Sequence, residues 1–165
     1  MFKLDVINTM NAEERLKYML ILVKGQISSE KDDLANISNI TGIIKACIDN
    51  LNWAGFYFLR NDELVLGPFQ GLPACNRIKI GKGVCGTSVK LREVQLVTDV
   101  ELFPGHIACD VASKSELVIP IIKDDKVYGV LDLDSPFKNR FTNLEKEYFI
   151  KLKDILQDKI DWDKI

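Results

Sequence analysis

The chain has 165 residues, of which 47% are hydrophobic and 28% are charged, the balance of an ordinary globular domain. A formal net charge of −2 requires no basic surface, so the composition gives no support for a nucleic-acid partner. The apolar run at residues 19–23 is too short for a secretion signal or a membrane span, and we therefore expect a cytoplasmic protein.

Two helices are predicted at the start of the chain. Apolar residues at helical spacing favour a helix over residues 11–24, with Asn11 as its N-cap and Gly25 ending it. A second helix is predicted over residues 32–49, and Cys47 within it is interpreted as a small core residue. The inner face of this second helix is expected to carry Leu34, Ile37, Ile40, Ile44 and Ile48.

Strand pairs follow. Residues 52–60 are rich in aromatic side chains and predict a strand, which a turn at Asn61-Asp62 joins to a partner strand over residues 63–69. Smaller elements come next: a loop at 70–76, a short strand at 77–80, a helix at 84–91 and a short strand at 94–97.

The second half of the chain contains a long loop and another hairpin. Residues 99–115 show no periodicity, and loops of this length tend to be functional. Residues 116–122 and 126–134 predict a hairpin, and Thr142 with Glu145 forms a capping box that starts a final helix. This order predicts an α+β fold: one domain over residues 1–165, with a central antiparallel sheet and the N- and C-terminal helices packed on one face.

Two ligand-binding interpretations are weak. The stretch GKGVCG at residues 81–86 fits G-x-G-x-x-G, but the preceding RIKI is too polar for a buried parallel strand, so a tight turn into a helix is favoured over a nucleotide site. Zinc could use Cys75, Cys85, Cys109 and His106, but no C-x-x-C pair is present. His106 is interpreted instead as a loop residue that orders the Cys109 turn or tunes its surroundings.

Thiol redox chemistry is the stronger hypothesis. Cys75, Cys85 and Cys109 lie in loops or at a helix start, and cytosolic thiols are normally reduced. Cys85 falls in the first turn of a predicted helix, where the backbone dipole favours a thiolate. A thiolate that attacks an oxidised substrate needs a second thiol to regenerate it through a disulfide, a role that suits Cys75. The alternative is three incidental buried thiols.

Carboxylates and aromatic residues could complete a pocket. Asp132 and Asp134 are two apart in a predicted strand and share one face, where each raises the pKa of the other, and Glu116 begins the neighbouring strand. The alternative is a solvated strand end. Trp53 and Tyr57 also share a face; such residues are usually core, but they would pack well against a thioether.

Seven segments together resemble the free methionine-(R)-sulfoxide reductases, which are GAF-domain enzymes. They are, in chain order, NWAGFYF, LGPFQG, ACNRI, GKGVCGT, DVxxFPGHIACD, ASKSELVIP and VYGVLDLDS. The resemblance implies thiol-dependent reduction of free L-methionine-(R)-sulfoxide to L-methionine, with no bound cofactor, thioredoxin as external reductant and a homodimer.

The resemblance also implies residue roles. Cys109 matches the catalytic cysteine, Cys75 the resolving cysteine, and Cys85 a third cysteine that helps recycling in some members. A Cys109 sulfenic acid would condense with Cys75 to give a Cys75–Cys109 disulfide. The substrate-binding residues it implies are Trp53, Tyr57, Glu116, Asp132 and Asp134. Two rival functions remain: a non-catalytic GAF module that senses a small ligand, and a thiol redox sensor.

Overall fold

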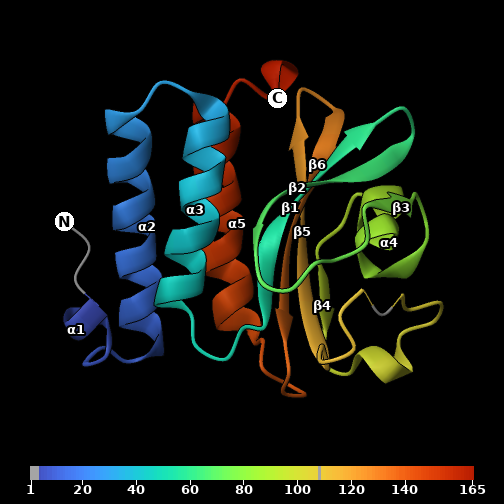
Figure 1. Cartoon of the computed structure of the whole chain (residues 1–165), viewed down its shortest axis with the longest axis horizontal. Coiled ribbons are helices and arrows are strands. Elements are labelled where there is room, and N and C mark those ends of the chain that lie inside the picture. The colour runs from blue at the N-terminus through green and yellow to red at the C-terminus, as the bar shows by residue number, and fades with distance from the viewer. Residues whose placement is uncertain (1–3, 108) are drawn as a thin grey trace.

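A six-stranded antiparallel sheet with the order β3-β2-β1-β6-β5-β4 forms the centre of the computed structural model, which describes residues 4–107 and 109–165 (Figure 1). Its strands are β1 (Trp53–Arg60), β2 (Glu63–Gln70), β3 (Arg77–Lys79), β4 (Gln95–Val97), β5 (Ser115–Lys123) and β6 (Lys126–Ser135). The α-helices are α1 (Leu4–Ile7), α2 (Ala12–Ser29), α3 (Asp33–Cys47), α4 (Gly83–Leu91) and α5 (Asn143–Lys159), and the short 3-10 helices are η1 (Val100–Leu102) and η2 (Trp162–Lys164).

Tight turns set the register of the two long hairpins. Asn61 and Asp62 connect β1 to β2, and Asp124 and Asp125 connect β5 to β6; all four have positive φ angles between 49° and 63°. Two successive positive φ angles match the right-handed twist of the flanking strands, and Asn and Asp tolerate that conformation better than most residues. Both predicted hairpins are therefore confirmed.

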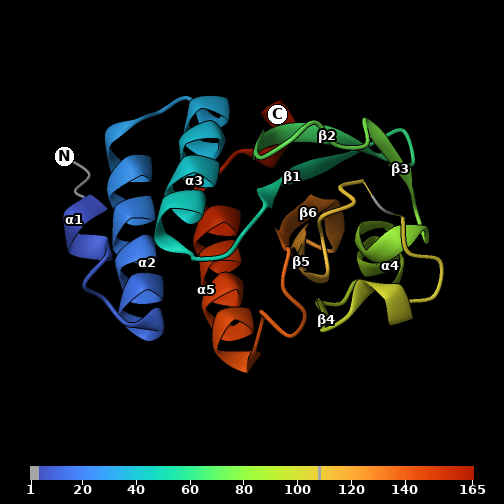
Figure 2. The same cartoon turned by 60° about the horizontal axis from the view of Figure 1, so that its bottom comes forward.

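The terminal helices cover one face of the sheet, as predicted. Figure 2 shows α3 and α5 against the sheet, with α2 forming an outer layer on these two helices. The side chains that this face buries against the helices are Ala54, Phe56, Phe58, Leu117, Ile119, Ile121, Leu131 and Leu133. Cys47 is fully buried in the same core, which confirms its interpretation as a core residue.

Two details of the helical layer differ from the prediction. Gly25 does not end the first helix, because α2 continues to Ser29 and places Gln26 where its side-chain amide donates to Asn36 Oδ1 at 3.2 Å. Leu34 is 53% exposed on the outer side of α3, although the other four expected residues of the inner face are buried.

The opposite face of the sheet carries a second, smaller core. The alternate residues of the same strands, including Trp53, Tyr57, Val118 and Val130, pack there beneath α4. The segments that follow β2 and β4 also lie on this side (Figure 2). None of the described helices combines the length and the hydrophobicity that a membrane crossing needs.

Candidate active site

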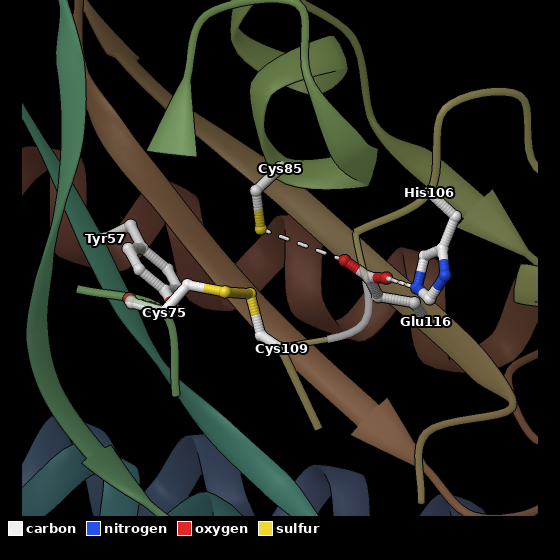
Figure 3. Close-up of a disulfide and its surroundings, with 6 residues drawn as sticks. All are labelled: Tyr57, Cys75, Cys85, His106, Cys109 and Glu116. Carbon is white, nitrogen blue, oxygen red and sulfur yellow. Dashed lines mark hydrogen bonds and ion pairs between the residues drawn. A yellow bond between two sulfur atoms is a disulfide. The ribbon is translucent and has the colours of Figure 1, made fainter. Parts of the chain in front are cut away.

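A disulfide bond joins Cys75, in the loop after β2, to Cys109, in the loop before β5 (Figure 3). The two residues are 34 positions apart in the chain, and their Cα atoms lie 5.2 Å apart. The pairing that the resemblance implies is thus present. Both cysteines are only partly buried, so the bond lies within reach of a reductant.

Three carboxyl groups gather on the same face of the sheet. Asp132 and Asp134 alternate along β6, and Glu116 on β5 lies directly opposite Asp134 in the strand register. Gly55 lies opposite Asp132 on the other side, where an added Cβ would come 2.4 Å from Phe69 Cβ. These carboxyl groups are therefore a buried cluster and not a solvated strand end: Glu116 and Asp132 are each 6% exposed.

Burial keeps most of this cluster uncharged. It raises the pKa of Glu116 and Asp134 well above the ordinary range, and the charge of Asp132 adds to the effect at both. Burial also raises the pKa of Asp132, to about 6. Burial and mutual repulsion therefore favour carboxylic acids, which can donate hydrogen bonds, and Asp132, with a pKa of about 6, is the group of the three that ionises most readily.

Cys85 lies at the start of α4, but it is not the thiolate that its helical position predicts. Its side chain is buried, and burial followed by the charges of Asp132 and Glu116 raises its pKa well above the ordinary value. Its Sγ lies 3.8 Å from Glu116 Oε1, at hydrogen-bonding distance for a thiol donor. A helix dipole favours an anion by less than these effects disfavour it.

The predicted aromatic residues Trp53 and Tyr57 stack on each other, and Phe69 joins them. Trp53 stacks on Tyr57 with ring centroids 5.8 Å apart, and on Phe69 with centroids 5.3 Å apart. The Tyr57 hydroxyl donates a hydrogen bond to the carbonyl of Cys75 at 3.0 Å. Tyr57 therefore also holds the Cys75 loop in place, a role that the sequence did not suggest.

A polar network fixes the loop that carries Cys109. The side-chain amide of Asn52, just before β1, donates to Asp110 Oδ2 at 2.8 Å and to Ser113 Oγ at 2.9 Å. Sequence reasoning missed these residues because the contacts span about 60 positions, although Asp110 and Ser113 stand in the segments that carry the resemblance.

Cys109 and the three carboxyl groups line one cavity of about 30 Å³, which is the space of roughly one water molecule, whereas Trp53 and Tyr57 are not part of its lining. Its lining includes Cys85, His106, Cys109 and the three carboxyl groups, together with Gly83 and Val84 from the first turn of α4. Among the described residues no side chain caps that helix end, and the Gly83 N–H donates to the Gly105 carbonyl at 3.2 Å. The next N–H groups of the first turn, on Val84 and Cys85, remain to bind an anion that enters the cavity.

The geometry argues against both ligand-binding alternatives from the sequence. The glycines at 81–86 connect β3 to α4, and β3 pairs antiparallel with β2, whereas a dinucleotide site needs a parallel strand there. A Cβ at Gly86 would lie 2.3 Å from the Lys79 carbonyl oxygen, so this glycine allows the helix to pack closely against the strand. The four-residue zinc set is not assembled, because Cys75 and Cys109 are bonded to each other. A different set, Cys85, Glu116 and Asp132, brings its donor atoms within 4.8 Å of one another and could hold a metal ion.

Comparisons with known proteins identify the fold family. The model of the GAF domain matches residues 34–152. The chain belongs to the GAF domain family. It is 47% identical over 121 residues to the free methionine-R-sulfoxide reductase of Escherichia coli, and the alignment covers 73% of each chain. It is 41% identical over 157 residues to the free methionine-R-sulfoxide reductase of Saccharomyces cerevisiae, and that alignment covers 90% of this chain and 87% of the other.

A solved structure agrees with this placement. The free methionine-R-sulfoxide reductase of Neisseria meningitidis, determined in complex with its substrate, superimposes with a TM-score of 0.89 at 34% identity, and 94% of each chain is covered. Within the GAF domains, this chain therefore belongs to the free methionine-R-sulfoxide reductases. The redox disulfide and the buried carboxyl cluster of this GAF domain lie around one cavity.

Proposed function

We propose that this chain reduces free L-methionine-(R)-sulfoxide to L-methionine, with Cys109 as the nucleophile and Cys75 as the resolving thiol. The observation that carries the proposal is the Cys75–Cys109 disulfide, whose Cys109 lines the same cavity as the three buried carboxyl groups. A pocket that joins a nucleophilic sulfur to carboxylic acids has what sulfoxide reduction needs: an attacking thiolate and a proton donor.

The cavity must widen before a substrate can bind. About 30 Å³ holds a water molecule and not an amino acid, and the disulfide ties the Cys75 loop to the Cys109 loop across it. Reduction frees both loops and exposes the Cys109 sulfur. Substrate binding is thereby limited to the reduced form, which is the form able to react.

Charge complementarity then orients the free amino acid. The Asp132 carboxylate binds the substrate ammonium group, and the uncapped first turn of α4 binds its carboxylate. The aromatic wall of Trp53, Tyr57 and Phe69 packs against the methyl-thioether end. Both charged groups of a free amino acid are thus matched inside the pocket.

The chemistry balances without a bound cofactor. The Cys109 thiolate attacks the sulfoxide sulfur while Glu116, as a carboxylic acid, gives its proton to the sulfoxide oxygen. A bond forms between Cys109 Sγ and the substrate sulfur while the sulfur–oxygen bond breaks and the protonated oxygen leaves as hydroxide. That hydroxide then bonds to Cys109 Sγ, the bond to the substrate sulfur breaks, methionine leaves, and Cys109 becomes a sulfenic acid. The Cys75 thiol then displaces water from that sulfenic acid and forms the disulfide, and Cys85 assists the later thiol exchange.

An external dithiol, thioredoxin, restores the two thiols. Exposed apolar side chains flank the two sulfurs in the chain: Leu72 near Cys75, and Ile107 and Val111 on either side of Cys109. Such side chains offer a contact surface to a protein partner.

A homodimer is also proposed, through the apolar groove between α2 and α3, which is lined by Ile21, Leu22, Gly25, Gly42 and Ile43.

The deciding experiment measures methionine released per enzyme from the free R-sulfoxide with thioredoxin, thioredoxin reductase and NADPH. Wild type should turn over many times, Cys109→Ser should release none, and Cys75→Ser should stop at about one methionine per enzyme. Cys47→Ser, which removes a buried thiol far from the disulfide chemistry, is the matched control and should keep full turnover.

The same measurement separates the rival functions. A non-catalytic ligand sensor would bind the sulfoxide without releasing methionine, and a thiol redox sensor would form its disulfide without consuming substrate in proportion. Multiple turnovers by Cys109→Ser would contradict the assignment of the nucleophile.

A further inference from the structure

His106 is the single histidine of the chain, and the chemistry described above leaves it unused. Figure 3 shows its ring directed at Glu116 from the side opposite Cys85, with His106 Nε2 4.0 Å from Glu116 Oε2. Glu116 thus lies between two groups that can exchange protons, with Oε1 facing the Cys85 thiol and Oε2 facing the imidazole.

The two neighbours differ in their access to water. Cys85 is 3% exposed, and the Glu116 side chain is 8% exposed, whereas the side chain of His106 is 17% exposed. His106 and Glu116 line the same cavity, and His106 is the more exposed of the two. The imidazole therefore offers a proton a path from solvent to Glu116.

The structure is also in the state in which Glu116 needs that proton. The Cys75–Cys109 disulfide forms after the sulfoxide oxygen has left, and therefore after Glu116 has given up its proton under the proposed chemistry. A buried carboxylate beside Asp132 and Asp134 is costly, so its reprotonation is favourable once a donor is in reach.

We propose that His106 is the proton relay that reprotonates the Glu116 carboxylate between turnovers. The neutral imidazole donates its Nε2 proton to Glu116 Oε2 and takes one at Nδ1 from water, then regains its first tautomer by exchange with water. One proton enters from solvent for each one that Glu116 gives to the sulfoxide oxygen. The inference rests on the proposed function.

The backbone around His106 suits small movements of this kind. The preceding Gly105 has a φ of 73°, and an added Cβ there would meet nothing within 4 Å. The Gly105 carbonyl accepts a hydrogen bond from Gly83 N–H at 3.2 Å, which ties the loop to α4. The loop is therefore held to α4 beside His106, while its backbone at Gly105 is not packed against other atoms.

The partial burial of His106 supports a neutral resting imidazole. Burial lowers its pKa, so it stays uncharged at neutral pH and can act as both donor and acceptor. The other titratable groups that line its cavity are Cys85 from α4, Asp110 from its own loop, Glu116 from β5, and Asp132 and Asp134 from β6.

The test separates the first turnover from the later ones in His106→Ala and His106→Gln. For the first turnover, reduced enzyme is mixed with excess R-sulfoxide in the absence of reductant, and the rate of release of the first methionine is measured. For steady state, dithiothreitol is added at a concentration high enough that the turnover rate no longer depends on it. Because Glu116 begins protonated, the first-turnover rate should stay within about twofold of wild type, while steady-state kcat falls about 10- to 100-fold. Imidazole added to His106→Ala should restore kcat in proportion to its concentration.

A purely structural role predicts another result. If His106 merely shapes the loop, both variants lose first-turnover rate and substrate affinity together and imidazole restores nothing, which overturns the relay. Steady-state kcat within twofold of wild type in both variants at plateau reductant, from pH 6 to 9, overturns it as well. Failure of wild type to release methionine would instead refute the proposed function, so the two failures are distinguishable.

Discussion

Asp132 keeps an ionisable carboxyl group in the protein interior, and the pH dependence of stability should reveal it. Burial raises its pKa from 3.8 to about 6. Between these pH values the folded protein retains a proton that the unfolded chain releases. The titration of Asp132 alone should therefore lower the free energy of unfolding by about 3 kcal/mol in total as pH rises from below 3.8 to above 6, at 1.36 kcal/mol per pKa unit.

Asp132→Asn removes this titration. Relative to wild type, the variant should gain about 2 kcal/mol of stability between pH 4 and pH 8, because the carboxyl group of the unfolded chain is already partly ionised at pH 4. The gain is a difference between two pH values, so any constant effect of packing the amide cancels. Urea denaturation of the oxidised proteins at pH 4, 5, 6, 7 and 8 measures it, with the disulfide intact in the folded and unfolded states.

The matched control is Asp158→Asn, which changes an exposed aspartate on α5 and should alter stability by less than about 0.5 kcal/mol at every pH. Asp132→Asn should also weaken substrate binding about 10- to 100-fold, because the ammonium group loses its charged partner. A wild-type-minus-variant difference that stays flat from pH 4 to 8 would refute the reasoning.

Two further predictions concern the packing of α4 and the reductant. Gly86→Ala places a methyl group 2.3 Å from the Lys79 carbonyl oxygen, and it should lower the free energy of unfolding by about 1–3 kcal/mol. Gly25→Ala is the control: its methyl group meets open space on α2 and should raise the free energy of unfolding by up to about 1 kcal/mol. Urea denaturation measures both changes. Val111 is 92% exposed beside Cys109, so Val111→Glu should disturb the contact with thioredoxin. Turnover with thioredoxin should slow about tenfold, and turnover with dithiothreitol should stay unchanged. Equal slowing with both reductants would contradict a role of Val111 in thioredoxin docking.

Much of the fold could be predicted because its signals are local. The Asn61-Asp62 turn carries its own backbone preference, and Thr142 with Glu145 forms the expected capping box at the start of α5. Gly25 misled for the same reason. Its local preference for helix ends costs only about 1 kcal/mol, which the packing of α2 on α3 outweighs.

The candidate site was less predictable where burial decides the chemistry. Position in a helix favours a Cys85 thiolate, but only the fold shows that the first turn of α4 buries the Cys85 side chain beside Glu116 and Asp132. Alternation along β6 correctly placed Asp132 and Asp134 on one face, whereas Asn52 and Phe69 reach the site through contacts between distant segments. Local spacing carries no signal for such contacts.

The three buried carboxyl groups also bear on the choice between a free amino acid and a peptide. Asp132, with a pKa of about 6, is the group of the cluster that ionises most readily, and the first turn of α4 presents backbone N–H groups nearby. A free zwitterion satisfies both, but a methionine sulfoxide within a peptide has neither charged group and would leave a buried carboxylate unpaired. Sites built on buried polar groups reject analogues that lack the partner by about 10⁴-fold or more. Burial thus has two effects: it destabilises the Asp132 carboxylate when no partner is bound, and it makes the pocket selective for the free amino acid, whose ammonium group supplies that partner.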